Sequence, residues 1–135
     1  MSEAKAGGVR ARPLSPHLQV WRWHLTLLVS ISHRATGVAL YVGAIIIAGF
    51  AAALASGPDA FNSYKSLLAS PIGLIVLIGL TFSAFFHMAN GVRHLVWDGG
   101  QGFQPRTATM TAAAVIGFAI VATVVVWAVA LTGAA

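Results

Sequence analysis

Three long stretches without a charged side chain constrain this 135-residue chain more than any other feature. They cover 24 residues (35–58), 27 residues (66–92) and 29 residues (107–135). A helix needs about 20 apolar residues to cross the hydrocarbon core of a bilayer. Hydrophobic residues make up 58% of the chain and charged residues 8%, which is far from the balance of a soluble domain. We therefore predict an all-α membrane protein with three transmembrane helices.

Glycines and prolines set the expected boundaries of these helices. Residues 1–24 contain several of them and are expected to form an exposed cytoplasmic arm. Residues 25–135 are expected to form the transmembrane domain, with spans at about 25–55, 69–97 and 107–132. Pro71 suits the first turn of the second span, and the glycines that follow Asp98 suit its end.

The distribution of Lys and Arg predicts the orientation. Five of the eight precede or open the first span, two surround the connection between the second and third spans, and only Lys65 lies between the first two spans. Because cytoplasmic segments carry the excess of these residues, the N-terminus is expected in the cytoplasm. The bases flank apolar runs and form no stripe that could follow a nucleic-acid groove, so no nucleic-acid partner is expected. The arm lacks the core and cleavage site of a secretory signal and is expected to be retained.

Small residues predict how the spans pack. Ala44, Ala48 and Ala52 recur every four residues on the first span, and such ridges let helices in lipid approach closely. The third span carries no ionisable group, so it is expected to be a scaffold.

Histidines in the second span are the main candidates for chemistry, because an ionisable group inside a membrane needs a partner. His87 and His94 are two helical turns apart on one face, and His87 lies near the middle of the membrane. One interpretation is a hydrogen bond between helices. However, His33 and Arg34 are expected at the same depth as Arg93 and His94, where they would form a collar of hydrogen-bond donors about two turns from His87.

A haem fits this arrangement, with its iron on His87 and its propionates directed at the collar. This chain offers no second histidine at the depth of His87. A second axial ligand would therefore come from another polypeptide, which predicts a heteromeric helical bundle. The absence of cysteine excludes thiolate zinc sites and c-type haem attachment.

Ser30 and Arg34 are four residues apart, on one face of the first span. Both donate hydrogen bonds, and arginine can stabilise negative charge on an oxygen, which suits a quinone carbonyl. The alternative is that Arg34 only marks topology and that Ser30 only caps backbone groups. No motif of a soluble active site is present, so no catalytic residue is predicted.

Two rival functions follow from the same residues. The first is a haem-free anchor that only assembles other subunits. The second is a proton or small-molecule conduit, which is disfavoured because the outer halves of the spans have almost no polar groups.

Three motifs carry a family resemblance: RPLSPHLQVWRW (residues 12–23), SISHRATGVAL (residues 30–40) and HMANGVRHLVWDGG (residues 87–100). In this order, on a chain of this length, they resemble the cytochrome b subunit of succinate dehydrogenase, the haem-carrying membrane anchor of Complex II. The resemblance covers residues 12–100, and the third span adds only hydropathy and position.

The resemblance implies haem b and ubiquinone. His87 would be one axial ligand of the iron, and a second small anchor subunit would supply the other. His33, Arg34 and His94 would lie on the propionate side, and Ser30 and Arg34 would bind ubiquinone. Electrons would come from an iron–sulfur subunit that works with a flavoprotein subunit in the tricarboxylic acid cycle, so this chain is expected to have no activity of its own.

The resemblance leaves quinol:fumarate reductases as an alternative, because they share this architecture. The N-terminal segment does not have the composition of a mitochondrial leader, which favours a bacterial inner membrane over the mitochondrial one.

Overall fold

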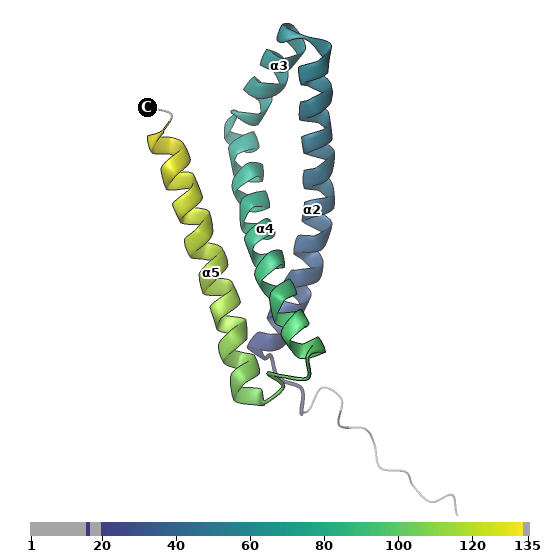
Figure 1. Cartoon of the computed structure of the whole chain (residues 1–135), viewed down its shortest axis with the longest axis vertical. Coiled ribbons are helices and arrows are strands. Elements are labelled where there is room, and N and C mark those ends of the chain that lie inside the picture. The colour runs from purple at the N-terminus through teal and green to yellow at the C-terminus, as the bar shows by residue number, and fades with distance from the viewer. Residues whose placement is uncertain (1–15, 17–19, 134–135) are drawn as a thin grey trace, which may run out of the picture.

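The computed structural model describes residue 16 and residues 20–133, and this part of the chain is helical apart from its short connections (Figure 1). The helices, in chain order, are α2 (Leu25–Ser56), α3 (Pro58–Leu68), α4 (Pro71–Asp98) and α5 (Pro105–Thr132). Helices α2, α4 and α5 are each long and apolar enough to cross a membrane. The prediction of an all-α protein with three apolar spans is confirmed. Most of the predicted arm, residues 1–15 and 17–19, lies outside the described residues.

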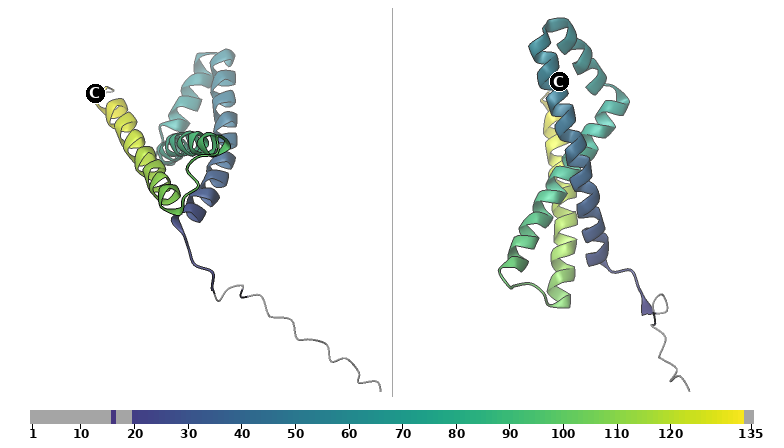
Figure 2. Two further views of the ribbon diagram at one scale, coloured as in Figure 1. Left: turned by 60° about the horizontal axis from the view of Figure 1, so that its bottom comes forward. Right: turned by 90° about the vertical axis from the view of Figure 1, so that its right-hand side faces the viewer.

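The long helices alternate in direction. As Figures 1 and 2 show, the beginning of α2, the end of α4 and the beginning of α5 meet at one end of the bundle. We call this the histidine end, because it contains His33, His87 and His94. Helix α2 has 32 residues and is about 48 Å long at 1.5 Å per residue, which exceeds the roughly 30 Å of the hydrocarbon core. It therefore tilts or extends beyond the apolar layer.

The short helix α3 was not predicted from the sequence. It follows Gly57, whose φ of +110° is a conformation that favours glycine, and it begins with Pro58 at its first turn. Tyr64 of α3 donates a hydrogen bond of 2.9 Å to the carbonyl of Ile46 in α2. With 11 residues of mixed polarity, α3 is too short to span a bilayer, so a search for long apolar runs overlooks it.

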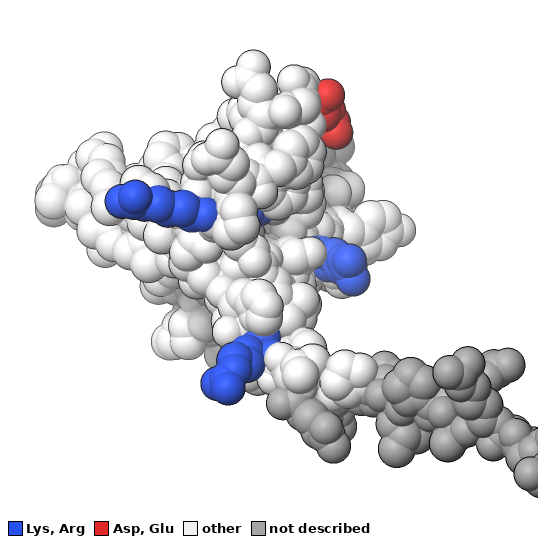
Figure 3. Space-filling view, turned by 90° about the horizontal axis from the view of Figure 1, so that it is seen from below, with Lys and Arg blue, Asp and Glu red and all other residues white. Residues whose placement is uncertain are grey.

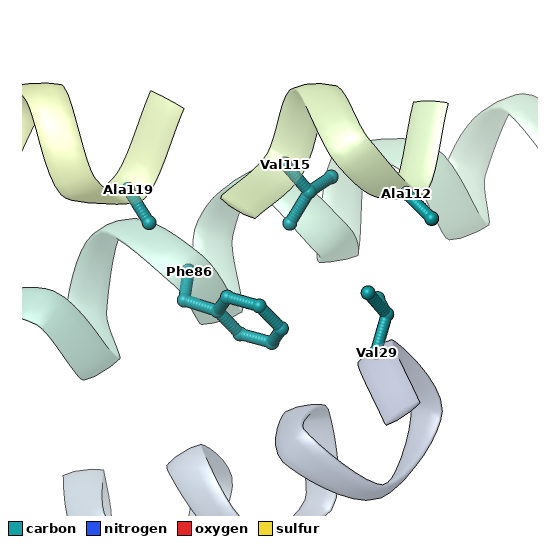
Figure 4. Close-up of a cluster of buried hydrophobic side chains, with 5 residues drawn as sticks. All are labelled: Val29, Phe86, Ala112, Val115 and Ala119. Carbon is teal, nitrogen blue, oxygen red and sulfur yellow. The ribbon is translucent and has the colours of Figure 1, made fainter. Parts of the chain in front are cut away.

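The buried core is small and lies between α2, α4 and α5. As Figure 4 shows, Val29 of α2 and Phe86 of α4 meet a row of small side chains on α5. Ala112 and Ala119 in this row are fully buried, and their size lets α4 and α5 approach closely. Nearer the C-terminus, Trp127 of α5 also donates a hydrogen bond of 3.3 Å to Thr81 of α4.

The predicted alanine ridge of α2 does not make the contact between helices within this chain. Ala44, Ala48 and Ala52 are all exposed. The buried small residue is instead Gly43, where a Cβ would lie 3.1 Å from the side chain of Leu80 in α4. The face that α2 turns to α4 therefore lies beside the ridge and not on it.

Gly49→Ala should loosen α3. A Cβ at this position would lie 2.7 Å from the hydroxyl oxygen of Tyr64, so the ring has to move and its bond to Ile46 weakens. Overpacking of this kind costs about 1–3 kcal/mol, so amide exchange in α3 should accelerate about tenfold in the purified membrane complex.

Gly79→Ala is the matched control, because no atom lies within 4 Å of a Cβ there. Adding Tyr64→Phe to Gly49→Ala removes the clashing oxygen and should bring the exchange rate of α3 close to that of Tyr64→Phe alone. Unchanged exchange in Gly49→Ala would contradict this account of the contact.

Candidate functional site

Three histidines from two helices converge at the histidine end. The rings of His33 on α2 and His87 on α4 are stacked, with centroids 3.9 Å apart and planes 12° from parallel. The ring of His94 lies 5.2 Å from that of His33. The sequence placed His33 level with His94 and two turns from His87, but its ring lies closer to His87. The reason is the register of α2 against α4. Side-chain packing sets this register, and the spacing of residues along each helix does not reveal it.

The hydrogen bonds of His87 determine which of its nitrogens is free. Its Nδ1 lies 3.1 Å from the backbone carbonyl oxygen of His33 and 3.3 Å from the hydroxyl of Thr36. That hydroxyl itself donates to the same carbonyl at 3.0 Å. Because a carbonyl only accepts, Nδ1 carries the proton, and in a neutral ring Nε2 then keeps its lone pair. Histidines that bind metals are commonly oriented by this kind of bond from the other ring nitrogen.

Two glycines leave space around His87. A Cβ at Gly37 of α2 would lie 3.1 Å from Cε1 of His87, so only glycine allows the ring this close to α2. A Cβ at Gly91, one turn after His87, would meet no atom within 4 Å. The surface of α4 one turn beyond His87 is therefore not covered by the described residues.

His33 has an unsatisfied polar atom. Its Nδ1 is buried and has no hydrogen-bond partner among the described residues. Buried polar atoms are nearly always paired, so such an atom calls for an explanation such as a missing ligand.

Arg93 does not join the predicted collar. It is 7% exposed, and its guanidinium is directed at α5. Its Nε donates to the hydroxyl of Thr111 at 3.0 Å, and its Nη2 donates to the carbonyl of Ala108 at 3.1 Å. The guanidinium also lies 3.9 Å from the ring centroid of Trp97. Helix α5 is thus more than a scaffold, and Thr111 at the matching depth of the third span is the signal that could have revealed this.

Asn90 is a residue that the sequence analysis missed. Its side chain is fully buried, and its Oδ1 accepts a 3.4 Å hydrogen bond from Nη1 of Arg93. Its Nδ2 lies 3.2 Å from Nε2 of His94. A neutral amide in a span is easily taken for packing. The available signal was its spacing of four residues from His94, which places both on one face of α4.

Ser30 and Arg34 lie on α2 close to the histidine cluster. Ser30 is half-buried and Arg34 is exposed, and neither side chain makes a hydrogen bond within the described part of the chain. Their donors are therefore not used by the described residues. Viewed from the histidine end, the basic side chains are spread over the surface and do not form one patch (Figure 3).

A bare metal ion is a poor fit to this site. Within residues 20–133, no group of three or more His, Asp or Glu side chains could hold one. His87 can supply one nitrogen to a metal whose other ligands come from elsewhere.

The fold and the site together define a small multi-pass membrane subunit with a histidine cluster at one end of its helices. Residues 9–126 match the family described as succinate dehydrogenase/fumarate reductase transmembrane subunit. The chain belongs to this family.

Its relatives include cytochrome b subunits of succinate dehydrogenase. The cytochrome b556 subunit of Rickettsia felis is 34% identical over 127 residues, which cover 94% of this chain and 99% of the relative. That of Paracoccus denitrificans is 37% identical over 110 residues, covering 82% and 85%. The mitochondrial cytochrome b560 subunit of Sus scrofa is 42% identical over 96 residues, covering 67% and 55%.

These matches confirm two predictions from the sequence. The motifs around residues 12–23, 30–40 and 87–100 indicated the cytochrome b subunit of succinate dehydrogenase, and the family and its relatives bear this out. The predicted location, as a multi-pass protein of a bacterial inner membrane, agrees with the transmembrane family, the apolar helices and the bacterial relatives.

Gly37→Ala should disturb the hydrogen bond that orients His87. The added methyl group would force the ring to move by a few tenths of an ångström, which lengthens the bond from Nδ1 to His33. NMR of ring-labelled histidine in the purified complex should show the Nδ1 proton of His87 shifted upfield. Gly117→Ala, where a Cβ meets no atom within 4 Å, is the control that should leave the signal in place. An identical signal in both variants would contradict the proposed contact.

Proposed function

We propose that this chain is the haem b-binding and ubiquinone-binding membrane anchor of a succinate dehydrogenase, where it helps to pass electrons from an iron–sulfur subunit to ubiquinone. The observation that carries the proposal is the orientation of His87. Its Nδ1 is bonded to the carbonyl of His33, and its Nε2 has no hydrogen-bond partner among the described residues.

The residues present fit a haem. In its neutral form, His87 offers the lone pair of Nε2 to a metal. At Gly91, one turn along α4, no described atom lies within 4 Å of a Cβ. The buried Nδ1 of His33 has no hydrogen-bond partner among the described residues, so it can bond to the bound group. We assign His87 as an axial ligand of the iron, and His33, Arg34 and His94 to the side of the propionate carboxylates, which need charged or donating partners. When bound, the haem supplies a centre that takes up and releases one electron at a time.

The second axial ligand comes, in this proposal, from a second small anchor subunit. The rings of His33 and His87 are stacked face to face at 3.9 Å, so His33 would not hold the haem iron together with His87. His94 lies two turns from His87 on the same helix and would not hold the iron together with it either. The site is therefore completed by another chain.

Ser30 and Arg34 are assigned to ubiquinone. A quinone carbonyl accepts hydrogen bonds, and negative charge grows on its oxygen during reduction. The Ser30 hydroxyl can donate to that oxygen, and the exposed guanidinium of Arg34 can donate and also stabilise the charge.

The rest of the assembly follows from this role. The named relatives are subunits of succinate dehydrogenase, so we expect a flavoprotein and an iron–sulfur subunit as partners. They would dock at the histidine end, which we place in the cytoplasm together with the arm at residues 1–24, because Lys and Arg are concentrated there. Residues 25–135 would form the membrane domain, and the chain would have no succinate-oxidising activity of its own.

Two alternatives remain distinct from this proposal. The family also covers fumarate reductases, so the complex can instead run in the direction of quinol oxidation. A haem-free anchor would share the fold but show no haem absorption.

His87→Ala should abolish haem binding. In the purified complex, the reduced-minus-oxidised spectrum should lose the bands of b-type haem, because the iron loses its ligand from this chain. His24→Ala is the control, because His24 is exposed and precedes α2. A full haem spectrum in His87→Ala, or none in the unaltered complex, would refute the assignment.

Arg34→Ala should lower quinone reduction about 10- to 100-fold, since a hydrogen bond to a charged group contributes about 1.5–3 kcal/mol. Ser30→Ala should lower it about fivefold, because it removes a neutral hydrogen bond. Succinate oxidation with a soluble dye should continue in both variants. Arg106→Ala removes an exposed arginine at the start of α5 and serves as the control. Normal quinone turnover in both variants would place the quinone elsewhere.

A further inference from the structure

A continuous chain of hydrogen bonds runs from α5 to the histidine cluster. It begins at Thr111 and Ala108, passes through the guanidinium of Arg93 and the amide of Asn90, and ends at Nε2 of His94. The function proposed above uses His94 but leaves Arg93 and Asn90 without a role.

The direction of these hydrogen bonds is fixed by chemistry. A guanidinium only donates, so the atom of Asn90 that faces Arg93 has to be its oxygen. The amide nitrogen of Asn90 therefore faces His94, and because this nitrogen only donates, Nε2 of His94 has to accept. In a neutral imidazole the proton is then on Nδ1.

The surroundings of Arg93 indicate that its guanidinium acts on Asn90 and not on a group outside the bundle. It borders a cavity of about 460 Å³ between α4 and α5 whose accessible walls are almost entirely apolar, so the guanidinium offers no polar surface to a lipid headgroup there. Its hydrogen-bond partners in the described chain are all neutral, so no carboxylate cancels its charge. Arg93 therefore acts on His94 through Asn90.

We propose that Arg93 and Asn90 are positioning residues that hold His94 with Nδ1–H as its free donor, directed at the anionic carboxylate of the bound group. This inference rests on the proposed haem site for the identity of that carboxylate. The tautomer of His94 is a property of this chain and does not depend on the haem.

Asn90→Asp is the decisive variant. It keeps the size of the side chain and still accepts from Arg93, but a carboxylate cannot donate to His94. Nε2 of His94 should therefore gain a proton. In the purified complex with ring-labelled histidine, NMR should show His94 protonated at Nδ1 alone in the unaltered protein and protonated at Nε2 in Asn90→Asp.

Three further variants, one of them a control, separate positioning from folding. Thr111→Val removes one acceptor of Arg93 and should broaden or shift the His94 signals without inverting them. Thr109→Val is its matched control, because the Thr109 hydroxyl is exposed and, among the residues that the structure describes, bonds only to Pro105 of its own helix. If Asn90→Asp does not assemble, Asn90→Leu tests the same point, because without an amide donor His94 should no longer be restricted to the Nδ1–H form.

The outcomes distinguish this inference from the function on which it rests. A proton on Nε2 of His94 in the unaltered protein, or an unprotonated Nε2 in Asn90→Asp, would overturn it. In the haem-loaded complex, Asn90→Leu should retain the haem bands but shift the midpoint potential, whereas Thr109→Val should not. Retained bands with an unshifted potential would overturn the link to the carboxylate. A haem-free unaltered complex would instead refute the proposed function while leaving the tautomer measurement intact.

Discussion

The hydrogen bond from Nδ1 of His87 to the backbone carbonyl of His33 is the interaction on which the rest of the structure depends. It crosses from α4 to α2 and joins the two helices at the histidine end. It also determines which nitrogen of the ring is available. Gly37 makes this contact possible, because any larger residue would hold the ring away from α2. Fold and candidate site are therefore specified by the same few atoms.

The chain by itself leaves much of its apolar surface uncovered. Tyr41 is 73% exposed and Val38 68% exposed, and both lie on α2 within a span that lipid or other helices must cover. Only five hydrophobic side chains are buried within the described residues. A core this small is consistent with a subunit that completes its packing in a larger bundle. The histidine cluster is consistent with the same conclusion, because the buried Nδ1 of His33 has no hydrogen-bond partner among the described residues.

Much of the fold could be predicted from the sequence, because crossing a bilayer imposes a simple requirement on length and polarity. For this reason the sequence predicted the three spans and the start of α4 at Pro71, and it also showed the family motifs. Helix α3 was not, because it lies outside the long apolar runs. The alanine ridge of α2 is exposed in this chain and its predicted contact with another helix stays a prediction, since a periodic pattern shows which residues share a face but not which face is covered.

The site was only partly predictable for a related physical reason. His33, His87 and His94 could be singled out because ionisable groups in a membrane need compensation. Which groups compensate them depends on helix register and side-chain direction, and so Arg93 was expected in the collar when its guanidinium is bonded to Thr111 of α5. Asn90 carries no charge, and its importance becomes visible only when both ends of its amide are seen to be occupied.

The hydrogen bonds from Arg93 to α5 have a consequence for the order in which the helices assemble. While the chain is being synthesised, α4 leaves the ribosome before α5, and at that stage Arg93 lacks the two acceptors that α5 supplies. A guanidinium whose only bond is to Asn90 of its own helix is costly in lipid, so we expect this part of α4 to stay near the headgroups or inside the translocation machinery until the last helix arrives. The last span to enter the membrane, α5, therefore supplies the acceptors that hold the polar end of α4.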